Sequence, residues 1–223
     1  MLTNPIFKCW MTMNRLEDNL FSLKHLLVPI VGLSVLSSIG AFQVDKEILY
    51  DISATLLDKK GHTFEVFWFY RLDEESWEGK GTLKILGRNY LSLDLPFMNV
   101  LIQNSVLSVR YPEEDQVLID YFNRRDPSNL FAVLLSDFGG FIVENIEVNN
   151  EQISLSLIPE TLVGFDRLWI SVKENEWMPK TIKAVSGKDL EIYVDVLSVG
   201  PLVNPEDLKM GKLTASEIID LRE

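Results

Sequence analysis

Hydrophobic and polar residues alternate with a period of two over most of the chain, from Thr63 to Val196. This alternation is typical of β-strands that bury one face and leave the other in water. Strands are predicted at Thr63–Arg71, Gly81–Leu86, Tyr90–Leu95, Val100–Gln103, Val106–Tyr111, Gln116–Phe122, Phe141–Val148, Ile153–Pro159, Arg167–Val172, Lys180–Val185 and Leu190–Val196, with turns at Asp73–Ser76 and Pro112–Asp115. Short, regularly spaced strands predict an antiparallel sheet that curls toward a barrel. The predicted fold class is therefore mainly β (α+β).

Three segments depart from this alternation and are predicted as helices. Asp45–Lys60 has apolar residues at helical spacing and is followed by Gly61, a residue that commonly ends helices. A second helix is predicted to begin with Asp126 as its N-cap and to continue through Leu130–Leu135, which is apolar on every side and should be buried. Thr214–Arg222 is predicted to form a short terminal helix.

The start of the chain resembles an export signal. The run Leu26–Val44 contains no charged residue, Lys24 precedes it, and it ends in small residues up to Ala41. This is the pattern of a secretory signal peptide, and cleavage is expected after Ala41. Residues 1–41 would then be a leader and residues 42–223 a single domain. An uncleaved anchor and a buried helix remain alternatives, because spanning a membrane takes about 20 apolar residues.

Few residues in the expected domain can support catalysis. Removal of the leader takes away the single cysteine, and it leaves His62 as the remaining histidine, expected at a surface turn. Cysteine–histidine catalysis and zinc sites built from Cys and His are then excluded. The two acidic clusters Asp73–Glu75 and Glu113–Asp115 fall in predicted turns, and Asp120 is expected to point outward. We therefore expect no enzyme, no metal and no cofactor. The net charge of −12 also argues against a nucleic-acid partner.

The positive signal is a surplus of apolar residues. Thr63–Arg71 is apolar on both faces, and Trp68 lies on the richer one. The next predicted hairpin carries Leu83, Ile85, Leu91, Leu93 and Leu95 on one face. An ordinary core is one interpretation of this set. The other is a cavity under the apolar helix that an acyl chain could enter, with about 0.8 kcal/mol gained for each buried CH₂ group.

Several motifs resemble the periplasmic carriers of outer-membrane lipoproteins, the LolA-like family. The matching segments are Gly81–Leu91, Leu107–Val117, Pro127–Leu135 and Ile153–Pro159, in the family's order. The resemblance extends from about Asp45 to Leu208. It departs from the family pattern where the inward arginine that closes the lid falls on Gly87, with Arg88 displaced by one residue.

The resemblance implies an unclosed antiparallel barrel with a helical lid over an apolar cavity. It implies a monomeric periplasmic carrier that takes lipoproteins from an inner-membrane transporter, binds their acyl chains and passes them to an outer-membrane acceptor. Arg88 is the candidate for lid control. The expected ligand-binding residues are Trp68, Leu83, Ile85, Leu91, Leu93, Leu95, Leu107, Val109, Leu130, Phe131 and Leu134.

Other functions stay open at this point. The same fold could serve as a membrane-anchored sensor of lipid or lipoprotein, and an uncleaved Leu26–Val44 segment would favour that interpretation. It could also be a structural envelope module with a filled core. A carboxylate-based enzyme is the remaining alternative.

Overall fold

The computed structural model describes residues 47–161, 164–173, 175–202 and 215–222, so the predicted leader and its cleavage site lie outside the described residues. Within these ranges, twelve strands form one sheet in the order β12-β6-β5-β4-β3-β2-β1-β11-β10-β9-β8-β7. Their bounds are β1 His62–Leu72, β2 Glu75–Leu86, β3 Tyr90–Leu95, β4 Met98–Gln103, β5 Val106–Tyr111, β6 Gln116–Tyr121, β7 Phe141–Asn149, β8 Gln152–Pro159, β9 Arg167–Lys173, β10 Pro179–Ser186, β11 Leu190–Pro201 and β12 Glu217–Asp220.

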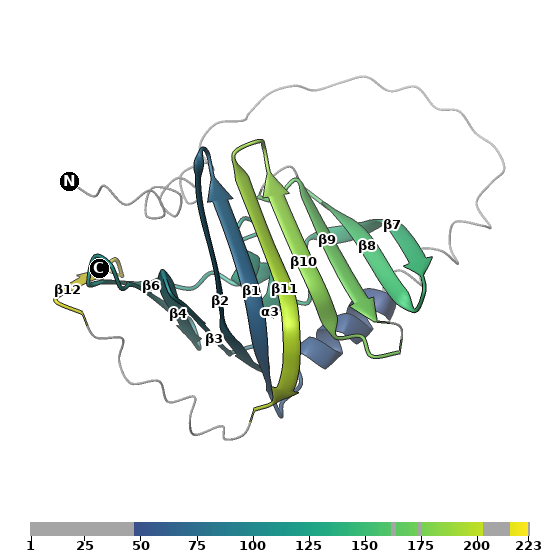
Figure 1. Ribbon diagram of the computed structural model, residues 1–223, viewed down its shortest axis with the longest axis horizontal. Helices are drawn as coiled ribbons and strands as arrows, with labels where there is room; N and C mark the ends of the chain where they lie inside the picture. The colour runs from purple at the N-terminus through teal and green to yellow at the C-terminus, as the bar shows by residue number, and fades with distance from the viewer. Residues whose placement is uncertain (1–46, 162–163, 174, 203–214, 223) are drawn as a thin grey trace.

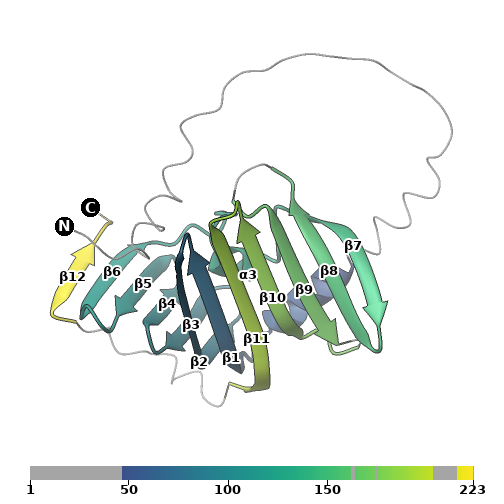
Figure 2. The ribbon, with the colours of Figure 1, turned by 45° about the horizontal axis from the view of Figure 1, so that its top comes forward.

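The sheet is curled but not closed. Strands β12 and β7 are its two edges, and neighbouring strands pair antiparallel except for β12, which runs parallel to β6. Figures 1 and 2 show the long strands β1, β2 and β11 at the centre of the sheet, with shorter strands curling away on both sides. The predicted fold class, a mainly β unclosed barrel, is confirmed.

In the described part of the chain, two helices lie on the same face of the sheet, the concave one (Figures 1 and 2). The described part of the first helix covers residues 47–56, and it ends earlier than Lys60 because the Asp58 side chain accepts a hydrogen bond from Lys60 N at 2.8 Å and turns the chain. The second helix, α3, is Leu130–Leu135.

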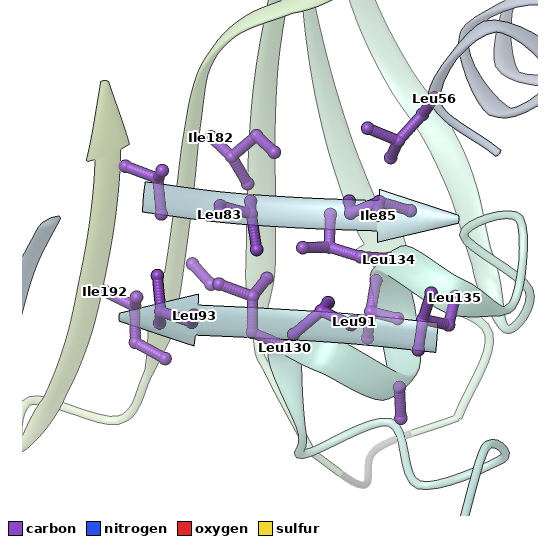
Figure 3. Close-up of a cluster of buried hydrophobic side chains, with 14 of the residues drawn as sticks. Leu56, Leu83, Ile85, Leu91, Leu93, Leu130, Leu134, Leu135, Ile182 and Ile192 are labelled. Carbon is purple, nitrogen blue, oxygen red and sulfur yellow. The ribbon is translucent and has the colours of Figure 1, made fainter. Parts of the chain in front are cut away.

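Alternation along the strands builds the core. Inward-facing side chains of β2 and β3 meet α3, as Figure 3 shows for Leu83, Ile85, Leu91 and Leu134. These four side chains are at most 5% exposed. Five of the six residues of α3 are buried, as its apolar composition predicted. The helix therefore fills part of the concavity of the sheet instead of lying on the surface.

Two of the helix predictions were wrong in their details. The described part of the predicted terminal helix contains strand β12, because its β-branched residues Ile218 and Ile219 pair with the free edge of β6. Helix α3 begins after Asn129 and not at Asp126, because the carbonyl of Pro127 accepts a hydrogen bond from Phe165 N at 3.3 Å. That bond ties the carbonyl to the loop before β9.

The strand and turn predictions also needed correction. Strand β2 begins at Glu75, inside the predicted turn, because Asp73 adopts a left-handed backbone with φ 54° and reverses the chain within two residues. Asp120 was expected to point outward. It lies opposite Leu107 in the β5–β6 register, on the concave side, and Tyr121 is the exposed neighbour at 64%.

Candidate apolar binding site

Helix α3 is held at its start by a side-chain cap. Asn129 Oδ1 accepts hydrogen bonds from Phe131 N at 3.0 Å and Ala132 N at 3.4 Å. The turn before it is fixed by Asp126, whose carboxylate accepts from Ser128 N at 2.9 Å. A helix of six residues has little stability of its own, so its position depends on these caps and on its packing.

A cavity of about 80 Å³ lies between α3 and the concave face of the sheet. Its walls come from strands β1, β4, β5 and β11, from the segment before β4, and from the start of α3. The lining residues are Trp68, Tyr70, Phe97, Met98, Val100, Leu107, Val109, Tyr111, Ser128, Asn129, Leu130, Phe131 and Ile192. The surface of the cavity is therefore almost entirely apolar, with a few hydroxyl, amide and indole groups.

The predicted binding residues divide into two sets. Five of them line the cavity: Trp68, Leu107, Val109, Leu130 and Phe131. The other six pack in the core beside it and are at most 5% exposed: Leu83, Ile85, Leu91, Leu93, Leu95 and Leu134. The leucine-rich hairpin thus contributes to the packing around α3 instead of to the cavity wall.

Several cavity residues were not among the predicted ones. Tyr70 lies on the same face of β1 as Trp68, so alternation alone could have identified it. Phe97 and Met98 stand at the β3–β4 turn, where no periodic signal marks a wall of a cavity. Ser128 and Asn129 were expected inside a helix, and the later start of α3 brings them to the cavity instead.

Trp68 connects the sheet to the helix. Its ring stacks on Phe131 of α3, with the centroids 5.8 Å apart and the planes at 27°. The side chain is 2% exposed, and its indole Nε1 is buried without a hydrogen-bond partner among the described residues. A buried donor that makes no bond costs about 1–3 kcal/mol, which makes this nitrogen unusual for the wall of an apolar cavity.

The β2–β3 turn contacts the chain on both sides of α3. Arg88 forms an ion pair with Asp137, two residues beyond the helix. Arg124, which precedes the helix, donates to the side chain of Asn89 and to Asn104 O at 3.1 Å. Arg88, the predicted residue for lid control, therefore contacts the segment that directly follows α3.

A second, smaller cavity of about 10 Å³ adjoins the first. It shares Leu107, Val109 and Tyr111 with the main cavity, and its other walls are Leu118, Asp120 and Leu221. Leu221 directly follows β12. The residue that follows β12 thus lines this small cavity at the β6 edge of the sheet.

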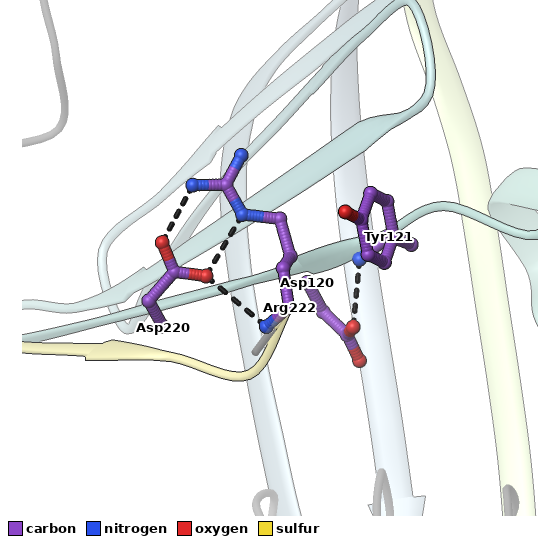
Figure 4. A network of polar contacts seen from close by, with 4 residues as sticks. All are labelled: Asp120, Tyr121, Asp220 and Arg222. Atoms are coloured by element: carbon purple, nitrogen blue, oxygen red, sulfur yellow. Dashed lines mark hydrogen bonds and ion pairs between the residues drawn. The ribbon is translucent and has the colours of Figure 1, made fainter.

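Strand β12 is attached to β6 by polar contacts at both of its ends. Gln116 Nε2 donates to Glu217 at 2.7 Å, and Leu221 N donates to Ile119 O at 2.8 Å. Figure 4 shows the local pair of Asp220 and Arg222 beside Asp120 and Tyr121. The hydrogen bonds from Arg222 lower the pKa of Asp220 to about 2.

The described residues show few groups suited to catalysis. Within these ranges, no cluster of three or more His, Cys, Asp or Glu could hold a metal ion. His62 is half-buried at the start of β1, and its Nε2 lies 2.9 Å from Thr55 O, so the predicted surface turn is wrong for this residue. No helix in the described part of the chain is long and apolar enough to cross a membrane.

Fold and cavity together define the class of protein: an unclosed antiparallel barrel with a buried helix and an apolar cavity on its concave face. The unclosed barrel is the fold that the sequence resemblance implied. No protein-family model and no curated protein matches the sequence.

Solved structures match the fold at low sequence identity. An uncharacterized conserved protein from Thermus thermophilus matches with a TM-score of 0.53 and 12% identity, over 80% of this chain and 99% of its own. A putative outer membrane lipoprotein-sorting protein domain from Vibrio parahaemolyticus matches 77% of this chain and 98% of its own at 11% identity, with a TM-score of 0.45. A LolA superfamily protein from Nitrosomonas europaea matches 74% and 96% at 9% identity, with a TM-score of 0.39. The first match shows a shared fold, and the other two are weaker similarities.

Proposed function

We propose that this protein is an exported carrier that binds the acyl chains of lipoproteins or lipids between α3 and the sheet. The observation that carries the proposal is the apolar cavity, which lies under a single short helix with its wall formed by residues of four strands and α3. Hydrocarbon transferred from water into such a cavity gains about 0.8 kcal/mol for each buried CH₂ group. No bond-breaking chemistry is needed for this role.

The size of the cavity supports a mobile lid. A volume of about 80 Å³ is well below the roughly 300–1,000 Å³ of typical ligand pockets. A long acyl chain therefore fits only if α3 moves away from the sheet. The chain would then contact the inward side chains of β2 and β3 that α3 now covers, including the leucines of Figure 3.

Exchange between helix and ligand makes the binding reversible. Removing α3 exposes apolar surface, and an acyl chain covers that surface again. The state with α3 on the sheet and the state with the acyl chain on the sheet therefore differ in free energy by much less than the full gain from burying the ligand. A carrier needs this near balance, because a ligand can shift a two-state equilibrium only by its difference in affinity for the two states.

The cellular part of the proposal rests on the resemblance and on the leader. Export through the predicted signal peptide would place the domain in the periplasm. The resemblance supplies the partners, an inner-membrane transporter as donor and an outer-membrane acceptor as recipient. An anchored sensor would use the same cavity without diffusing.

Native mass spectrometry tests the proposal. The full coding sequence is expressed in a bacterial host with two membranes, and the exported protein is purified without detergent. A bound mass matching a lipid or an acylated protein is the expected result. The mass of the polypeptide also reports cleavage after Ala41. An apo protein that ignores an added triacylated peptide would contradict the carrier proposal and favour the structural module.

A cavity-filling variant gives the matched control. Val109→Phe adds a ring to the cavity wall, so we expect a folded protein with less bound ligand. Ile119→Phe adds a larger side chain to the half-buried convex face of β6, away from the cavity, and should keep its ligand. Equal ligand content in the two variants would indicate binding elsewhere on the protein.

A further inference from the structure

The cavity wall contains a buried donor, the indole N–H of Trp68, that has no hydrogen-bond partner among the described residues. Five buried side-chain nitrogen or oxygen atoms lack a hydrogen-bond partner within the described ranges, and among them Trp68 Nε1 belongs to a cavity residue. The indole is 2% exposed, so bulk water does not reach it freely. Buried polar groups are normally paired, and an orphaned one calls for an explanation.

Neighbouring residues keep the indole in place beside the cavity. Trp68 pairs with Gly79 in β2 and with Val194 in β11. Gly79 has no side chain, and Pro96 and Phe97 fill the space beside it, since a β-carbon at Gly79 would lie 3.1 Å from Pro96 Cδ and 3.6 Å from Phe97 Cε1. Phe131 covers one face of the ring from α3. The position of the N–H is therefore set by the sheet and the lid together.

Other polar groups at the start of α3 are already engaged. Asn129 uses its side-chain oxygen to cap the helix, and the Ser128 hydroxyl donates to the Asp126 carboxylate at 2.5 Å. An indole N–H is a donor only, so the group that satisfies it must be an acceptor. A hydrocarbon chain has no such group. A carboxylate has one, but burial of its charge in an apolar cavity is costly.

We infer that the ligand carries an ester or amide carbonyl whose oxygen accepts a hydrogen bond from Trp68 Nε1. Trp68 is then a specificity-determining residue that distinguishes an acyl chain from a plain alkyl chain. The inference rests on the proposed function, because it assumes that an acyl chain enters this cavity. Acyl esters occur both in phospholipids and in lipid-modified proteins, and both carry the carbonyl.

Two soluble lipids that differ in the carbonyl alone test the inference. The probes are the diacyl and the dialkyl-ether forms of the same short-chain phosphatidylcholine, both kept below their micelle concentrations. Isothermal titration calorimetry on the full chain measures both affinities. We expect the wild type to bind the diacyl form about tenfold more tightly, the factor that corresponds to one buried hydrogen bond.

Two variants test whether the preference for the diacyl lipid depends on Trp68 Nε1. Trp68→Phe keeps an aromatic ring and removes the donor, so both lipids should bind it equally. Trp77→Phe is the matched control, because Trp77 packs on Tyr70 and does not line the cavity, and it should keep the tenfold preference. A preference that survives in Trp68→Phe would overturn the inference.

The outcomes separate this inference from the proposed function. Binding of neither lipid, and of no triacylated cysteinyl peptide, would contradict the proposed function itself. Equal binding of both lipids to the wild type would leave the carrier standing and overturn the carbonyl contact. Tighter binding of the triacylated peptide than of the diacyl lipid would point to lipoproteins as the source. Equal binding of the two would point to acyl lipids in general.

A nuclear magnetic resonance measurement covers the case in which Trp68→Phe fails to fold. In wild-type protein labelled with ¹⁵N at its tryptophans, either lipid should shift the Trp68 indole N–H signal by displacing Phe131, and the diacyl lipid should move it further downfield than the dialkyl lipid. Equal shifts with both lipids, or a shift with neither, would overturn the inference.

Discussion

Arg88 and Asp137 form an ion pair that joins the β2–β3 turn to the segment directly after α3. Both side chains are partly exposed, at 57% and 33%, so the pair contributes little to overall stability. Its position next to α3 means that it can affect the movement of the helix more than the stability of the domain. The segment after the helix must move whenever α3 leaves the sheet, and the ion pair opposes that movement.

Arg88→Ala should therefore loosen the lid more than it destabilises the domain. We expect a loss of less than about 1 kcal/mol in the free energy of unfolding. Hydrogen exchange of the α3 amides should be up to about fivefold faster, because a loss of about 1 kcal/mol in the free energy of local opening raises the open population by that factor. Exchange mass spectrometry measures this rate. Asp137→Asn, which keeps a side chain that tolerates the left-handed backbone at φ 60°, should speed the exchange to a similar extent, and unchanged exchange in Arg88→Ala would separate this residue from the lid.

Leu134→Glu tests whether α3 acts as a lid. Leu134 is 1% exposed and packs among the leucines of β2 and β3. A buried carboxylate without a partner is strongly unfavourable, so the helix should leave its site while the sheet stays folded. We expect impaired ligand uptake with a retained β-type circular dichroism spectrum. Leu134→Met conserves volume, costs less than about 1.5 kcal/mol and should bind normally. Normal uptake by Leu134→Glu would contradict the lid assignment.

The strands of this protein could be predicted from the sequence because burial alternates along them. In β1 the inward residues Phe64, Val66 and Trp68 are at most 2% exposed, as the pattern of the segment indicated. The same local signal could not reveal which inward residues line a cavity and which fill the core. That division depends on where α3 packs, and α3 covers the β2–β3 hairpin while leaving Trp68 and Val109 beside open space.

The errors in the sequence-based prediction have a common physical cause, which is competition from distant parts of the chain. Asp126 and Pro127 are good first residues for a helix, but Phe165 takes the Pro127 carbonyl. The end of the chain has apolar residues at spacings that suit a helix, but the edge of β6 offers it backbone hydrogen bonds. Neither partner is visible in the local sequence.

Gly164→Ala should disturb the approach to the lid. Gly164 has φ +91°, and a β-carbon there would collide with the backbone of Pro127. The left-handed conformation alone costs a non-glycine residue about 1–2 kcal/mol, and the collision pushes residues 126–129 away. We expect lower thermal stability and faster hydrogen exchange in α3. Gly187→Ala is the matched control, because its φ is also positive but the nearest atom to a β-carbon there, Asp189 N, is 4.0 Å away. Equal effects of both substitutions would mean that backbone strain, and not the contact with Pro127, is responsible.

The attachment of β12 should depend on pH through Asp115. Ser216 N donates to the Asp115 carboxylate at 3.1 Å, and the hydrogen bonds from Ser216 hold the pKa of Asp115 below its ordinary value of 3.8. Because the pKa is lower in the folded state, this contact stabilises β12 at pH values above 3.8. The stabilisation is lost as the pH falls through the lowered pKa and the carboxylate is protonated.

The Ser216 and Glu217 amide signals should therefore move toward unfolded positions in an acid titration followed by ¹⁵N nuclear magnetic resonance. Asp115→Asn should weaken the attachment already at neutral pH and remove this step from the titration. Release of β12 should also open the small cavity at the β6 end of the site, since Leu221 lines it together with Leu107 and Val109. If the amide signals of β12 stay unchanged in Asp115→Asn, the pairing of Ile218 and Ile219 with β6 holds the strand without help from the carboxylate.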